Sequence, residues 1–261
     1  MRKKFLILLS LCLLGLLCSF IYSLFDEDLD EIRKTITFPS RDGVKITADT
    51  YIKYMPNSTP LIVLFHQEDW SRGEYAETAY TFVKNGFNCM AVDLRSGNHV
   101  NGVENQTMLQ AKKAGKGTRY LDALRDVEAA LSYSRVTFRN TKIIALGSSY
   151  SASLVLKVAG ENPELLDGVM AFSPGEYFVE EGKPVTWIQD SARKIQLPVF
   201  ITSARNEKFQ WINIFQAINS QSKMSYLPIA QGYHGSRSLW SKHKDNEVHW
   251  KMMQTFIKSY F

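Results

Sequence analysis

The residues best suited to chemistry are serines in a tight turn between two apolar segments. Residues 143–146 form a short apolar run that predicts a buried strand, and residues 154–158 have the apolar spacing of a helix. The turn between them is Gly147-Ser148-Ser149-Tyr150-Ser151. A serine at such a sharp turn projects its hydroxyl out of the sheet, beside a helix N-terminus that stabilises negative charge. Ser149 is therefore a candidate nucleophile, and the alternative is an ordinary strand–helix turn that contains serines by chance.

A histidine further along the chain is the candidate base. A serine hydroxyl is a weak nucleophile near neutral pH, so it needs an adjacent base and an acid that orients that base. Three histidines follow Ser149: His234, His243 and His249. His234 lies in the glycine-flanked segment 231–235, after the last predicted strand, and we assign it the role of base. His243 and His249 fit surface or packing roles better.

The candidate acid is Glu207. It ends the loop that follows the predicted strand 197–202, from where it can reach a histidine on the next loop. The alternative is a solvated carboxylate at the start of the following helix, where glutamate is favoured in any case. The adjacent Asn206 could also orient an imidazole, but it would not stabilise the positive charge that forms on the ring.

Attack by a serine on a carbonyl group leaves a negative charge on the carbonyl oxygen, the oxyanion. Two backbone N–H groups should stabilise it. One is that of Tyr150, which directly follows the candidate nucleophile. The other comes from the turn after the apolar strand 61–65, where either Gln67 or Glu68 can supply it. His66 opens the same turn, and we interpret it as a structural histidine, because a backbone donor does not require its imidazole.

The remaining polar motifs do not indicate a bound metal or cofactor. No His, Asp or Glu cluster has metal-ligand spacing, and no glycine-rich nucleotide motif follows a strand. Asp93 and Arg95 follow a predicted strand, and we interpret both as structural groups that fix loop turns beside the site.

Apolar runs alternate with amphipathic segments along the chain, which predicts an α/β fold with a mainly parallel sheet of about eight strands. A hairpin with its turn at residues 42–43 should precede the parallel strands. Residues 96–117 are polar and predict a long loop with at most one short helix. The expected strands are 33–39, 44–54, 61–65, 87–94, 143–146, 168–172, 197–202 and 226–230, and the expected helices are 73–85, 120–133, 185–194, 209–218 and 246–260 besides the one after the turn. Every candidate site residue follows the carboxyl end of a strand, where such sheets form their sites.

The N-terminus indicates export. Three basic residues, 2–4, precede the apolar run 5–25, and an acidic stretch, 26–31, closes the segment. The run is long enough for a signal sequence or for a membrane anchor, and the flanking charges place the following domain outside the cytoplasm. We therefore divide the chain into a targeting or anchoring segment, 1–31, and one domain, 32–261.

The charge and the cysteine content argue against a nucleic-acid partner and against a disulfide within the domain. The net charge of +5 over 261 residues is mild, and no basic run with interleaved aromatic residues appears, so nucleic acid is not an expected partner. Two of the three cysteines, Cys12 and Cys18, lie in the N-terminal run. Cys89 is therefore the only cysteine left in the domain, which excludes a disulfide within it.

The domain resembles the α/β-hydrolase superfamily, in particular its compact dienelactone-hydrolase-like and esterase-like members, over residues 32–261. The resemblance rests on the segments LIVLFHQ, FNCMAVDLRSG, GSSYS, PVFITSARNE and GYHG. The chain departs from the family pattern in having Ser151 and Gln67 where glycine is common and Glu207 where aspartate is commoner. It also has a serine where dienelactone hydrolases have a cysteine nucleophile, so dienelactone is not implied as the substrate.

The resemblance implies a serine hydrolase that cleaves a small carboxylic ester through an acyl-enzyme, without a cofactor. Only a short helix fits between residues 173 and 196, so no large cap is expected, and the site should be open and bordered by residues 96–117. A peptidase or amidase with the same triad is one alternative, and a non-catalytic binding protein of the same fold is another. Neither the substrate nor the oligomeric state follows from the sequence.

Overall fold

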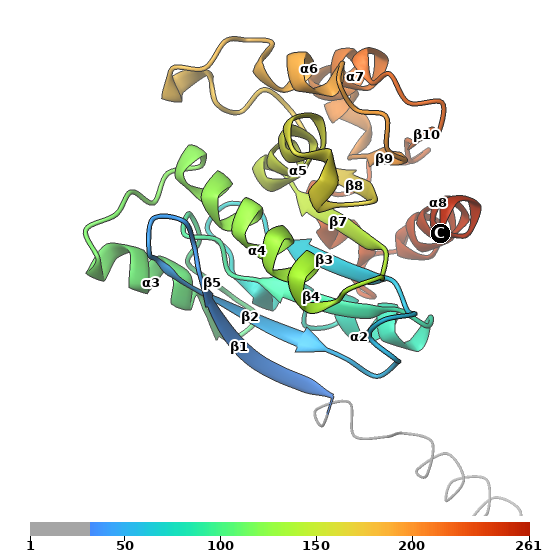
Figure 1. Cartoon of the computed structure of the whole chain (residues 1–261). Helices are drawn as coiled ribbons and strands as arrows, with labels where there is room; N and C mark the ends of the chain where they lie inside the picture. Colours follow the sequence, from blue (N-terminus) through green and yellow to red (C-terminus); the bar gives the residue numbers. More distant parts are fainter. Residues whose placement is uncertain (1–31) are drawn as a thin grey trace, which may run out of the picture.

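A single mainly parallel sheet forms the centre of the computed structural model, which describes residues 32–261 (Figure 1). The strand order is β1-β2-β4-β3-β7-β8-β9-β10. β2 runs antiparallel to both of its neighbours, and the remaining neighbours pair in parallel. The predicted fold class is confirmed, while the predicted targeting or anchoring segment, 1–31, lies outside the described residues.

The elements alternate along the chain as the apolar pattern indicates. The strands of the sheet are β1 (Arg33–Pro39), β2 (Lys45–Tyr51), β3 (Leu61–Phe65), β4 (Asn88–Val92), β7 (Ile143–Ser148), β8 (Gly168–Phe172), β9 (Val199–Thr202) and β10 (Lys223–Tyr226). A small separate hairpin joins β5 (His99–Val100) and β6 (Val103–Glu104). The helices are α2 (Thr78–Lys84), α3 (Gln106–Lys113), α4 (Leu124–Thr137), α5 (Tyr150–Glu161), α6 (Trp187–Ala192), α7 (Lys208–Ala217) and α8 (Asn246–Tyr260). Short 3-10 turns include η1 (Arg72–Tyr75), η5 (Arg205–Glu207) and η6 (Gly235–Leu239).

The apolar strands are buried on both faces, which explains why they read as continuous runs. In β3, Leu61, Val63 and Phe65 face the core under α4 and α5, whereas Ile62 and Leu64 face the core under α2 and α8. The sheet is therefore covered by helices on both sides, and the loops at the strand ends are left to hold residues of a site.

Two segments differ from the predicted pattern. The predicted strand 226–230 is instead β10, which ends at Tyr226, because Pro228 has no N–H to donate to a neighbouring strand. Residues 96–117 form the β5–β6 hairpin and α3, and they pack on the fold. The Thr47 N–H of β2 donates to Thr107 Oγ1 of α3 at 2.9 Å, so α3 lies against β2. All residues of β2 after Lys45 are buried, and the strand does not alternate between buried and exposed residues.

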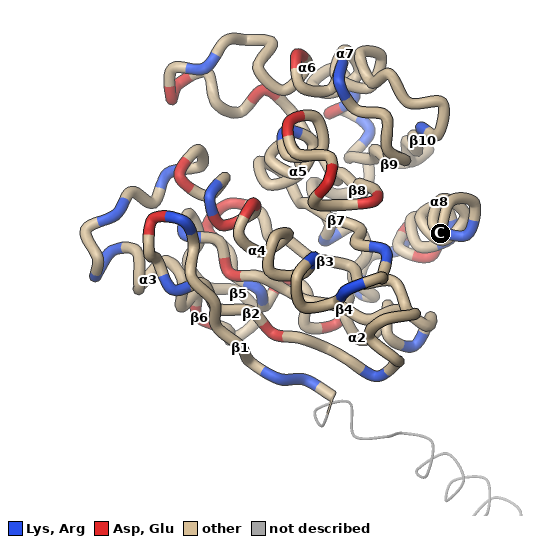
Figure 2. The backbone as a smooth tube through the Cα atoms, viewed as in Figure 1, with Lys and Arg blue, Asp and Glu red and all other residues tan. Residues whose placement is uncertain are grey.

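Basic and acidic positions are interspersed over the elements in Figure 2, as expected from the mild net charge of +5. Two arginines nevertheless make buried clusters. Arg72 pairs with Asp93 at 2.7 Å, and Arg95, which is only 1% exposed, pairs with Asp42 and Asp126, both at 2.7 Å. Asp93 and Arg95 thus pair with different partners, and each ties the end of β4 to another segment.

Replacing Arg95 with methionine should destabilise the protein by about 3–5 kcal/mol, because it leaves the buried carboxylate of Asp126 without its cation. The free energy of unfolding in urea measures this effect. Arg125→Met is the matched control: Arg125 lies on the same helix as Asp126, is 50% exposed and pairs only loosely with Asp122, at 3.5 Å. Its loss should cost less than about 0.5 kcal/mol. Equal stability of the two variants would contradict a structural role for Arg95.

Candidate active site

The turn between β7 and α5 has the backbone strain of a residue held out of the sheet. Ser149 has φ 61° and ψ −126°, a conformation that costs a non-glycine residue free energy and is found mostly at functional sites. Gly147 makes the turn possible, because a Cβ there would lie 2.5 Å from the Cα of Ala152. Ser149 therefore sits at the N-terminus of α5 with its side chain directed away from the strand.

Ser151, at the last position of the turn, makes hydrogen bonds that a glycine could not make. Ser151 is buried, and its hydroxyl donates to the carbonyl of Phe65 at 2.8 Å, while its Oγ accepts from the Ser148 N–H at 2.9 Å. Ser151 therefore ties the turn to the end of β3. The departure from the family pattern is accommodated by hydrogen bonds in addition to small size.

Three predicted site residues meet at the carboxyl edge of the sheet. His234 Nε2 lies 2.8 Å from Ser149 Oγ, and His234 Nδ1 lies 2.6 Å from Glu207 Oε1. Because a carboxylate only accepts, Nδ1 carries the proton and Nε2 is free to accept from the serine hydroxyl. The three side chains come from loops after β7, β9 and β10, and they form one continuous chain of hydrogen bonds.

Glu207 is held in its charged form by its surroundings. Burial raises the pKa of this carboxyl, but hydrogen bonds from His234, Ser173 and the Ala204 N–H outweigh burial and bring the pKa below its ordinary value. Asn206, the alternative partner of the histidine, is not in this hydrogen-bonded chain of the described residues. The carboxylate therefore stays negative beside the imidazole over the neutral pH range.

Ser173 is a member of the site that the sequence argument missed. It directly follows β8 with φ 56°, and its hydroxyl donates to Glu207 Oε2 at 2.7 Å. Its Oγ also accepts from the Gly235 N–H at 2.8 Å, next to His234. Its place directly after a buried strand, at the same edge as the other candidates, was the available signal.

Of the three predicted oxyanion donors, two have an N–H that is free to bind a substrate oxygen and one does not. Tyr150 is the first residue of α5, so its N–H has no partner within the helix and stays available as a donor. Gln67 is excluded, because its N–H donates to the carboxylate of Glu74 at 2.7 Å. Of the two alternatives in the turn after β3, the N–H of Glu68 is the one left for a substrate.

His66 is buried and neutral. Its Nε2 accepts from the Leu94 N–H at 2.8 Å, so the proton lies on Nδ1, which donates to the Gln67 carbonyl at 2.7 Å. Burial lowers the pKa of this imidazole to about 4. Both ring nitrogens are thus occupied by backbone groups, and His66 braces the turn rather than facing the site.

Glu74 is a second buried carboxylate beside the site, and burial raises its pKa from 4.5 to about 7. A raised pKa means that the folded state favours the protonated acid. The resulting stability is full below pH 4.5 and is lost as the pH rises to about 7. We expect the stability of the wild type relative to Glu74→Gln to fall by up to about 3 kcal/mol across this range.

Urea unfolding of both proteins between pH 4 and 8 measures this difference, and groups that titrate equally in both cancel. A difference that stays constant or grows with pH would contradict a buried Glu74 with a raised pKa.

A cavity of about 360 Å³ opens beside Glu68, the donor that remains in the turn after β3. Its polar and aromatic lining includes Glu68, Ser96, Arg119, Tyr120, Tyr177 and Glu181. Of the polar segment 96–117, which we expected to border the site, only Ser96 lines this cavity.

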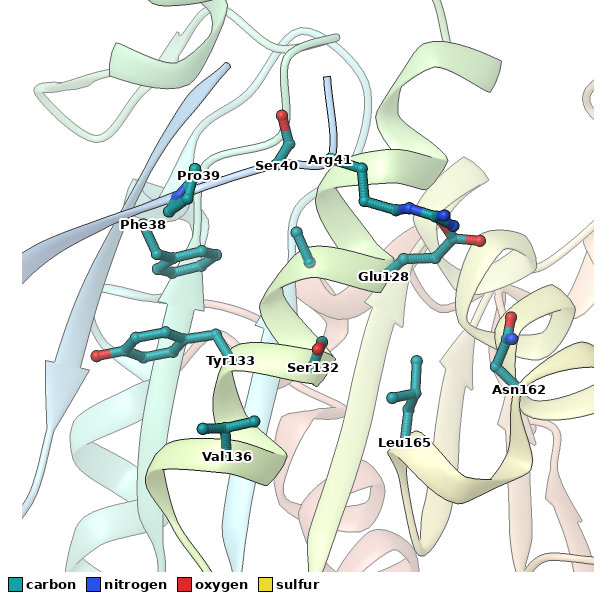
Figure 3. Close-up of a pocket in the computed structure, with 11 residues that line it drawn as sticks. Phe38, Pro39, Ser40, Arg41, Glu128, Ser132, Tyr133, Val136, Asn162 and Leu165 are labelled. Carbon is teal, nitrogen blue, oxygen red and sulfur yellow. The ribbon is translucent and has the colours of Figure 1, made fainter. Parts of the chain in front are cut away.

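A larger cavity of about 480 Å³ lies away from the site, between the end of β1 and α4 (Figure 3). Phe38 and Tyr133 stack at one side of it with ring centroids 4.5 Å apart, and Arg41 and Glu128 point toward one another at the other. None of the three residues of the hydrogen-bonded chain lines either cavity, so cavity size does not identify the site.

Comparison with known proteins agrees with the fold. A family model described as serine aminopeptidase, S33, matches residues 56–180. The structure is similar to esterase Pf2001 from Pyrococcus furiosus (TM-score 0.65, 17% identity, covering 87% of this chain and 92% of that one). It is similar as well to a dienelactone hydrolase from Anabaena variabilis (TM-score 0.66, 12% identity, 88% and 98% covered). A third similar structure is an acetyl xylan esterase from Paenibacillus sp. R4 (TM-score 0.63, 16% identity, 87% and 83% covered).

A search of the curated proteins by sequence finds no match. The strand order, the serine turn and the family match together define a serine hydrolase with the α/β-hydrolase fold. In the described residues no large cap covers the sheet edge, since the segment between β8 and β9 contains only the 3-10 turn η4 (Val179–Glu181) and the short α6.

Among residues 32–261, no helix is both long enough and apolar enough to cross a membrane.

Proposed function

We propose that this protein hydrolyses small carboxylic esters through an acyl-enzyme, with Ser149 as nucleophile, His234 as base and Glu207 as the acid that orients it. The hydrogen-bonded chain from Glu207 through His234 to Ser149 is the observation that carries the proposal. Its distances of 2.6 Å and 2.8 Å are those expected of a base in contact with its nucleophile.

The chemistry follows from these positions. Ser149 Oγ attacks the ester carbonyl carbon while His234 Nε2 takes its proton, and the N–H groups of Tyr150 and Glu68 stabilise the oxyanion. Collapse of the intermediate breaks the bond to the alcohol oxygen, which leaves with the proton from Nε2. Water then repeats the sequence on the acyl-enzyme, and Glu207 stabilises the imidazolium in both halves.

Ester substrates are favoured by the accessible site and by the activities named for the similar structures, two of which are esterases. The name of the family model supports a second candidate, a peptidase or amidase that uses the same three residues. A non-catalytic binding protein receives no support from the geometry, because it would leave Ser149 and His234 free to lie apart.

A fluorophosphonate probe, followed by mass spectrometry of the labelled peptide, tests the proposal. Labelling at Ser149, with faster turnover of p-nitrophenyl acetate than of alanine p-nitroanilide, is the expected result. A preference for the anilide would favour the peptidase alternative. A folded protein that neither takes up the probe nor cleaves either substrate would refute a hydrolase built on Ser149.

We also propose that residues 5–25 direct the domain out of the cytoplasm, either as a cleaved signal or as an anchor. The basic residues before this run and the acidic residues after it support this orientation. Mass spectrometry of the N-terminus of the native protein, with cell fractionation, distinguishes the two forms, and recovery of the intact chain in the cytoplasmic fraction would refute both.

A further inference from the structure

Glu74 is a buried carboxylate for which the proposed mechanism has no use. It lies in η1 and is completely buried. The nearest arginine in sequence, Arg72, pairs instead with Asp49 and Asp93. Burying a carboxylate without a cation costs several kcal/mol unless its oxygens receive good hydrogen bonds. The groups that donate to Glu74 should therefore show what it does.

One oxygen of Glu74 holds the turn after β3, residues 66–68, which we call the oxyanion turn because it contains the Glu68 N–H. Oε2 accepts from the Gln67 N–H at 2.7 Å, and His66 Nδ1 donates to the carbonyl of the same residue, also at 2.7 Å. That carbonyl shares a planar peptide with the Glu68 N–H, and the two point in opposite directions. Both peptide groups of Gln67 are thus fixed, and the direction of the Glu68 N–H is fixed with them.

The other oxygen of Glu74 holds the loop that contains His234 and Ser236, which we call the histidine loop. Oε1 accepts from the hydroxyl of Ser236, which lies two residues after His234. The Ser236 N–H donates to Ser148 Oγ at 2.9 Å, and Ser148 directly precedes Ser149. One carboxylate therefore connects the turn after β3, the loop of the base and the turn of the nucleophile, although 162 positions separate Glu74 from Ser236.

We propose that Glu74 is a positioning residue, whose carboxylate aligns the oxyanion turn with the histidine loop and thereby sets the rate of acyl transfer. The inference rests on the proposed function, because the Glu68 N–H must stabilise an oxyanion for its direction to matter. Alignment of this kind acts on the transition state, so its loss should lower kcat and leave substrate binding nearly unchanged.

Glu74→Gln tests the proposal with little change in side-chain size. The amide oxygen of glutamine can accept from the Gln67 N–H or from the Ser236 hydroxyl, but its amide nitrogen has no lone pair for the other. We expect kcat for p-nitrophenyl acetate to fall about 10- to 100-fold, with KM within about threefold of the wild type. The fraction of enzyme that a fluorophosphonate titrates should stay at the wild-type level. The matched control is Glu77→Gln. Glu77 is an exposed glutamate three positions after Glu74, so this variant should leave kcat unchanged.

Ser236→Ala provides a second variant that keeps Glu74 in place. It removes one of the two hydrogen bonds, so kcat should fall about 3- to 10-fold. In the double variant the two effects should not multiply, because both substitutions break the same connection. If Glu74→Gln does not fold, Ser236→Ala decides alone, and an unchanged kcat overturns the proposal.

Three other results would also overturn it. Glu74→Gln could turn over as fast as the wild type, its KM could rise while kcat stays the same, or its lower kcat could follow from a matching loss of titratable sites. The last outcome would make Glu74 a structural residue only. A wild type that the probe does not label at Ser149 would instead refute the proposed function itself, and this inference with it.

Discussion

Ser149→Ala should abolish ester hydrolysis, with a loss of about 10⁴- to 10⁶-fold in kcat. Alanine removes the only atom that can form the acyl-enzyme and keeps the rest of the turn. Its smaller side chain also fits the strained backbone, at φ 61°, no worse than serine does. The oxyanion donors remain, so a small residual rate above that of water is expected. Turnover of p-nitrophenyl acetate, measured with circular dichroism as a check on folding, gives the result.

Ser148→Ala is the matched control for this variant. Ser148 is the preceding residue of the same turn and is completely buried, and its Oγ accepts from the Ser236 N–H rather than contacting His234. Its loss removes hydrogen bonds to the Ser236 N–H and to Glu74 but no contact with the base, so activity should stay within about tenfold of the wild type. If Ser148→Ala lost all activity while Ser149→Ala kept it, the nucleophile would have been assigned to the wrong serine.

The strands and the site loops were predictable wherever local pattern and burial coincide. Residues 61–65 read as one apolar run because the strand has helices on both faces, and its bounds match those of β3. The prediction for β10 was less accurate, because this edge strand has mixed polarity and its end depends on Pro228 rather than on an apolar pattern. Local pattern thus identifies central strands far better than edge strands.

The supporting residues of the site were not predictable in the same way. Glu74 and Ser173 act through partners 162 and 34 positions away, respectively, and neither lies in a motif with a known spacing. The choice between Gln67 and Glu68 likewise depended on one contact with Glu74, which only the folded chain creates. Sequence spacing can nominate groups that follow strands, but it cannot say which backbone donors are already occupied.

Glu207→Gln should lower kcat about 10³- to 10⁴-fold while changing KM little. The glutamine has the same shape but carries no charge, so it cannot stabilise the imidazolium that forms on His234 when Ser149 gives up its proton. Its amide nitrogen can also face Nδ1, which would then have to accept, and this moves the ring proton to Nε2 and blocks proton transfer from the serine. Steady-state hydrolysis of p-nitrophenyl acetate measures the loss.

Asn206→Ala is the comparison that assigns the acid. Asn206 precedes Glu207 in the same 3-10 turn, but Nδ1 of His234 faces the carboxylate at 2.6 Å. Its replacement should therefore leave kcat within about threefold, since no contact of the reacting groups is removed. Glu207→Asp separates charge from reach: the carboxylate is kept but is one methylene shorter, so an intermediate rate is expected. Full activity in Glu207→Gln together with a large loss in Asn206→Ala would mean that an amide, not a carboxylate, orients the base.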